Sequence, residues 1–72
     1  MGFSLFDVVQ LEVDLPAAGL RKGDRGAVVH VFSKPTEAYE IEFTSPEPGE
    51  LLTETLCSTQ ISLVWAASVN KN

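Results

Sequence analysis

Apolar and polar residues alternate along much of this chain with a period of two, the period of a β-strand that buries one face. The run at 38–44 shows this best, because three apolar residues there alternate with two glutamates. In chain order these are Tyr39, Glu40, Ile41, Glu42 and Phe43. The pattern predicts a strand with Ile41 and Phe43 in the core and the two glutamates on the opposite face.

Four further runs predict strands, and turn-forming residues separate them. The five predicted strands cover 7–14, 26–33, 38–44, 51–57 and 61–65. Proline has no N–H to donate to a ladder, so Pro16 should end the first strand. Two prolines and a glycine make 45–50 a loop, and 58–60 is predicted to be a short turn or one turn of 3₁₀ helix.

The order of these elements predicts an all-β fold, a small five-stranded antiparallel SH3-like barrel. An open sheet of this size would leave two long unpaired edges, which a barrel avoids. A long loop after the first strand, then hairpins, then a short turn before the last strand match such a barrel. We therefore expect one domain over 1–65 and a C-terminal tail over 66–72.

Several strings resemble a family of small bacterial proteins known only as a domain of unknown function. They are FDVVQL at 6–11, DLP at 14–16, GLRKGDRGAVV at 19–29 and AYEIEF at 38–43. The family has no established activity, so the resemblance implies no catalytic residue. More loosely, the glycine turn at 23–26 and its following valines are similar to the KOW element of ribosomal and transcription-elongation proteins.

Hydrophobic residues make up 44% of the 72 residues, which is more than so small a body can bury. The surplus predicts self-association as a homo-oligomer, most simply a dimer. Trp65 ends the last predicted strand and is the leading candidate for the interface, with Tyr39 and Val8 beside it. Trp65, Tyr39 and Phe32 could also line a peptide groove, although we expect Phe32 in the core.

Ten acidic residues against five basic ones give a net charge of −5, which repels a phosphate backbone. Glu12, Glu40 and Glu42 form an acidic strip if the first and third strands expose their polar faces on the same side. Such a strip is either a solvated face or a docking surface for a basic protein. The alternative is a KOW-like, RNA-associated module that uses the basic loop, whose cations are Arg21, Lys22 and Arg25.

The residues that could carry catalysis or bind a metal are few. His30 shares a strand face with Val28 and Phe32 and has no second ligand at metal-site spacing. The single cysteine, Cys57, excludes an internal disulfide, fits a reducing compartment and is expected to be a small buried side chain. We predict no catalytic residue, metal or cofactor.

The glycine turn leads into a strand, whereas phosphate-binding loops lead into a helix. Gly23 and Gly26 are therefore expected to supply positive φ or a bulge, and Asp24 to bond within the turn. With no apolar run near bilayer length and no basic leader, we expect a cytoplasmic protein. The sequence thus predicts a non-catalytic protein-interaction module that self-associates and presents an acidic surface to a partner, as antitoxins and immunity proteins do.

Overall fold

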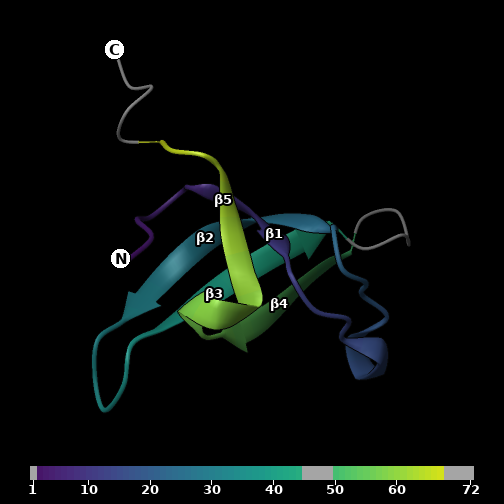
Figure 1. Ribbon diagram of the computed structural model, residues 1–72, viewed down its shortest axis with the longest axis horizontal. Coiled ribbons are helices and arrows are strands. Elements are labelled where there is room, and N and C mark those ends of the chain that lie inside the picture. Colours follow the sequence, from purple (N-terminus) through teal and green to yellow (C-terminus); the bar gives the residue numbers. More distant parts are fainter. Residues whose placement is uncertain (1, 45–49, 68–72) are drawn as a thin grey trace.

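The computed structural model describes residues 2–44 and 50–67, and over these residues the chain forms one antiparallel sheet (Figure 1). Its strands are β1 (Val8–Leu11), β2 (Arg25–Phe32), β3 (Ala38–Thr44), β4 (Leu51–Leu56) and β5 (Ile61–Trp65). Two 3₁₀ helices, η1 (Pro16–Ala18) and η2 (Ser58–Gln60), precede β2 and β5. The all-β prediction is confirmed, as are the third strand and the 3₁₀ turn before the last one.

The predicted closure into a barrel is wrong, because the sheet stays open. Its strand order is β4-β3-β2-β1-β5, so β4 and β5 are the two edges. The short helix η2 links these edges directly, so they approach each other at that end. Figure 1 shows β5 running steeply across the direction of β3 and β4. Two strands that cross in this way cannot form a hydrogen-bond ladder, which needs matched directions.

The core lies on one face of the curved sheet, which we call the inner face. It is built from Val9, Leu11, Leu20, Val28, Tyr39, Ile41, Phe43, Leu56 and Ile61, each at most 5% exposed. On β3 the alternation places three of these side chains inward, and the two glutamates between them are half-buried on the outer face. Burial of Ile41 and Phe43 is therefore confirmed.

An irregularity in β2 changes which face its last residues occupy. The pairing of β2 with β3 shifts register between Val28 and His30, so Val29 is the extra residue of a β-bulge. Val28 is buried, whereas His30 and Phe32 lie on the outer face with their ring centroids 4.4 Å apart. The prediction that Phe32 is a core residue is wrong, and His30 shares a face with Phe32 but not with Val28.

The first strand is shorter than predicted because the following loop folds back onto its end. The N–H of Leu11 donates to the carbonyl of Asp24, and its own carbonyl accepts from Gly23 at 2.8 Å. Glu12 turns instead to η2, where its N–H donates to the carbonyl of Gln60. Val13, predicted to lie in the strand, is 37% exposed beyond its end.

Gly23, in the loop before β2, and Gly26, within β2, act as expected in part. Gly23 has φ of +94°, a conformation that costs other residues strain. Gly26 has no positive φ, but a Cβ there would lie 2.7 Å from the carbonyl oxygen of Glu42 and 2.7 Å from Ile41 Cγ2. Its role is to let β2 and β3 approach closely.

The predicted tail begins as an ordered segment. The N–H of Ala67 donates to Asp7 Oδ1 at 3.0 Å, and the rest of the predicted tail, 68–72, lies outside the described residues. Within residues 2–44 and 50–67, neither 3₁₀ helix approaches the length and hydropathy that crossing a bilayer requires.

Candidate functional site

The outer face of the sheet carries most of the residues predicted to contact a partner. Residues opposite each other in neighbouring antiparallel strands lie on the same face. The strand registers therefore place one residue from each strand in a single row across the outer face. From the β5 edge to the β4 edge the row reads Trp65, Val8, Ala27, Glu42 and Thr53.

A shallow hollow of about 270 Å³ lies along this row. Val8, Ala27 and Leu51 supply apolar lining, and Glu42 and Arg25 place opposite charges beside it. Trp65, opposite Val8 in the ladder, is 45% exposed, and Leu51 is 66% exposed. An apolar hollow with charged neighbours can take up a long side chain of a partner and pair with its charged end.

Glu40 and Glu42 form the acidic part of the outer face. Both are half-buried on β3, and two residues of strand separate them by roughly 7 Å. Glu40 lies opposite His30 on β2 and Thr55 on β4. Glu42 lies opposite Ala27 on β2 and Thr53 on β4, and Arg25 lines the same hollow as Glu42.

The third predicted member of the acidic strip, Glu12, is not adjacent to the other two. It follows the end of β1, where Ser62 Oγ donates to Glu12 Oε2 at 2.5 Å and Gln10 Nε2 at 3.5 Å. The hydrogen bond from Ser62 is the main cause that lowers the pKa of Glu12 below its usual value. Strand β2, which carries Arg25, separates Glu12 from the two glutamates of β3. The hydrogen bonds of Glu12 thus link the end of β1 to β5.

Tyr39 is a core residue, so its side chain cannot take part in an interface of the folded chain. It is 0% exposed, and its ring meets the ring of Phe3 edge-on at a centroid distance of 5.3 Å. Its hydroxyl oxygen accepts the N–H of Phe3 at 3.2 Å, and burial raises the pKa of the phenol. In the sequence, Tyr39 is two residues before Ile41 and four before Phe43, and this spacing indicated that it shares their face of the strand.

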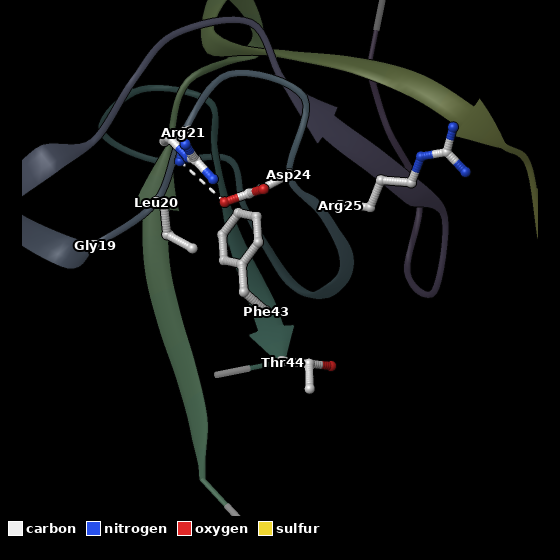
Figure 2. Close-up of a pocket in the computed structure, with 7 residues that line it drawn as sticks. All are labelled: Gly19, Leu20, Arg21, Asp24, Arg25, Phe43 and Thr44. Atoms are coloured by element: carbon white, nitrogen blue, oxygen red, sulfur yellow. Dashed lines mark hydrogen bonds between the residues drawn. The ribbon is translucent and has the colours of Figure 1, made fainter. Parts of the chain in front are cut away.

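The basic loop surrounds a second pocket, of about 320 Å³, at the end of the sheet (Figure 2). Asp24 Oδ2 accepts the N–H of Arg21 at 2.9 Å, and Asp14 Oδ1 accepts the N–H of Lys22 at 2.9 Å. Carboxylates of the chain thus occupy the backbone donors that an anion would use. The local bond predicted for Asp24 is confirmed.

The cations of this loop do not form one patch. In Figure 2, Arg25 lies on the far side of Asp24 from Arg21, and its guanidinium points away from the pocket. Leu20 and Phe43 also line this pocket. A phosphate backbone would therefore meet separate single charges with a carboxylate between two of them.

The remaining reactive side chains are isolated within the described part of the chain. The prediction that Cys57 is buried is wrong: its thiol is exposed at the start of η2, with Sγ 3.1 Å from Thr59 Oγ1. That contact lowers the pKa of the thiol. Over residues 2–44 and 50–67, no three side chains of His, Cys, Asp or Glu gather where they could hold a metal ion.

Sequence reasoning missed Ala27 and Leu51 as parts of the outer face. Ala27 enters it because it lies opposite both Val8 and Glu42, and Leu51 because it lies opposite Thr44. These relations depend on strand register. The sequence predicted a strand over 51–57 but not which strands it pairs with, so it gave no signal for either residue.

Residues 5–62 match the model of a family described as a domain of unknown function, DUF4926. The chain belongs to this family. The resemblance to a family of unknown function is thereby confirmed, and the matched region runs from the turn before β1 into β5. No curated protein and no solved structure matches the DUF4926 chain.

Proposed function

We propose that this DUF4926 protein is a non-catalytic protein-interaction module that self-associates and presents the acidic outer face of its sheet to a basic partner protein. The observation that carries the proposal is the row from Trp65 through Val8 to Glu42. It combines an exposed aromatic, an apolar hollow and a carboxylate on one face that no other segment among residues 2–44 and 50–67 covers. Aromatic anchors beside charged groups are typical of protein interfaces.

The net charge of −5 favours a basic partner for this face. Long-range attraction between opposite charges accelerates encounter, and close contact then fixes the orientation of the partner. A concrete form is a small acidic protein that neutralises a basic one, as an antitoxin or immunity protein does. The hollow beside Glu42 suits the methylene stem of a lysine or arginine whose charged end meets the carboxylate.

A role without catalysis is favoured by how the reactive groups are distributed. A nucleophile needs an adjacent base, and a general acid or base needs a cleft that changes its pKa. Cys57 lies at the chain segment between β4 and β5, and His30 lies on the outer face of β2. Nothing in the described part of the chain brings them together.

The RNA-associated alternative has weaker support. It would rest on Arg21, Lys22 and Arg25, and the first two are adjacent to carboxylates that bond their backbone. It remains an outcome that the following experiment can reveal.

The test is capture of a partner by the immobilised protein, followed by a binding titration with the purified partner. The decisive variant combines Glu40→Gln with Glu42→Gln, which removes two outer-face charges at nearly constant shape. Its matched control combines Glu37→Gln, in the turn before β3, with Glu54→Gln on β4, which also removes two negative charges but neither from the outer-face row. We expect the outer-face pair to weaken binding about tenfold or more, and the control to leave it nearly unchanged.

Equal weakening by both pairs would overturn the assignment of the outer face. Retention of RNA that is lost with Arg21→Glu and Arg25→Glu would instead favour the alternative. If neither protein nor RNA is retained, the proposed interaction with a partner fails.

A further inference from the structure

The two edges of the sheet differ in how well they are protected from pairing with another strand. Edge strands expose backbone N–H and C=O groups, and proteins blunt them with charges, prolines or inward-pointing charged residues. On β4, Glu54 lies opposite Ile41 and therefore on the inner face, which is such a device. The other edge, β5, has the sequence Ile-Ser-Leu-Val-Trp and contains neither a charge nor a proline.

The segment around β5 is the longest uncharged stretch near an edge. From Thr55 to Ala67 the sequence contains no Asp, Glu, Lys, Arg or His. Two copies of a chain with a net charge of −5 repel each other wherever carboxylates meet. The β5 edge is a place where two copies can approach without bringing their glutamates into contact.

Apolar side chains gather at this edge. Leu63, Val64 and Trp65 on β5 are 51%, 37% and 45% exposed. The turn before β1 adds Leu5 at 47% and Phe6 at 64%, and Asp7 holds that turn beside the end of β5 through Ala67. Three of the nine large exposed apolar residues among those described therefore lie on β5, and two more lie in the turn that Asp7 links to Ala67.

We propose that two copies of this chain pair antiparallel along their β5 edges, which joins two five-stranded sheets into one continuous sheet across a two-fold axis. The proposal rests on the self-association in the proposed function and names its surface. Antiparallel pairing of a strand with its own copy is self-complementary, as an interface with two-fold symmetry requires. Trp65, the first residue of the outer-face row, lies on the paired strand, whereas the part of the row around Glu42 lies on β3 and stays free for a partner.

The bulge of β5 and its short length limit the strength of this pairing. The register of β5 against β1 shifts at Val64, so Ile61–Leu63 is the regular part of the edge. Pairing over so few residues buries less than the roughly 1,200–2,000 Å² of a stable interface. We therefore expect a monomer–dimer equilibrium that responds to concentration.

The first test measures solution mass by light scattering over a concentration series up to about 1 mM. The variant is Leu63→Lys on β5, and the matched control is Leu51→Lys, the same change at an exposed leucine on the opposite edge. We expect the wild-type mass to rise from 7.8 kDa toward twice that value. Leu63→Lys should stay monomeric, and Leu51→Lys should behave as the wild type.

A second measurement covers the case in which Leu63→Lys fails to fold. In a Cys57→Ser background, single cysteines at Ser62, Leu63 and Val64 are oxidised in turn, with Leu51→Cys as the control. Opposed residues of an antiparallel pair have Cα atoms about 4.5–5.5 Å apart, which suits a disulfide. At least one β5 cysteine should give a covalent dimer at a rate several-fold above the control.

The outcomes separate this inference from the proposed function. A dimer that persists in Leu63→Lys and dissociates in Leu51→Lys, with no preferential β5 cross-linking, overturns the β5 pairing and leaves self-association standing. A wild-type monomer at every concentration overturns both the pairing and self-association. The charge-neutralised variants at Glu40 and Glu42 test the partner-binding face independently.

Discussion

Asp7 and Ala67, 60 residues apart, are joined by a hydrogen bond of 3.0 Å from the Ala67 N–H to Asp7 Oδ1. The other carboxylate oxygen, Oδ2, accepts the N–H of Ser4 at 2.8 Å. Asp7 is 5% exposed, and both hydrogen bonds are partly shielded from solvent. One side chain therefore holds the turn before β1 and the end of β5 in place.

Replacement of Asp7 should be among the more damaging single changes. Asp7→Ala removes two partly buried hydrogen bonds to a carboxylate, and we expect the free energy of unfolding to fall by about 2 kcal/mol. Urea denaturation measures this loss. The control is Asp14→Ala, which removes one exposed bond to the Lys22 N–H and should cost about 1 kcal/mol or less. Equal losses for the two variants would contradict the role given to Asp7.

Gly26 should tolerate no side chain, for a reason different from that at Gly23. Gly26→Ala places a methyl group against backbone of β3, and we expect a loss of about 1–3 kcal/mol in unfolding free energy. Gly23→Ala meets open space but adopts positive φ, at a cost of about 1 kcal/mol. Thermal unfolding compares the two. A Gly26→Ala protein as stable as the wild type would show that β2 and β3 are not packed this closely.

The phenol of Tyr39 should make stability depend on pH in the alkaline range. Burial raises the pKa of Tyr39 in the folded chain, so the unfolded chain loses the proton first as pH rises. The contribution to stability is therefore present below about pH 10 and lost above it. Tyr39→Phe should weaken this alkaline dependence, which denaturation at a series of pH values measures. An unchanged profile in Tyr39→Phe would assign the dependence to other groups.

The bond between Ser62 and Glu12 should be visible in a titration. The hydrogen bond from Ser62 lowers the pKa of Glu12 in the folded chain. Its stabilising contribution is therefore fully present above the usual glutamate pKa of about 4.3 and is lost as the pH falls through the lower pKa of Glu12 in the folded chain. Ser62→Ala should raise the pKa of Glu12 toward its usual value, as followed by NMR of the side-chain carboxyl carbon. Ser58→Ala, in η2, is the control and should leave it unchanged.

The alternation of apolar and polar residues was sufficient to predict a strand that has one buried and one exposed face. The alternation from Tyr39 to Phe43 gave β3 with its bounds and its inward side chains. The 3₁₀ turn at 58–60 lay where it was expected, whereas the loop predicted at 45–50 lies, apart from Glu50, outside the described residues. These features depend on residues within a few positions of each other, so the sequence contains the information directly.

Features that depend on pairing between distant segments could not be predicted from the local sequence pattern. The bulge at Val29 moved Phe32 out of the core, and it exists because β2 must match the register of β3. The steep course of β5 left the sheet open, and the burial of Asp7 depends on Ala67, which follows β5.

The order of residues alone is enough to predict the all-β class, the bounds of β3 and its core side chains, and it sets the net charge of −5. Tertiary structure decided which face each residue of β2 occupies, that Glu12 is separate from Glu40 and Glu42, and that β5 is an edge. The physical reason is that alternation gives side-chain direction only relative to a strand's own neighbours. Which strands pair, in which register and around which bulge, follows from packing the whole sheet over one core.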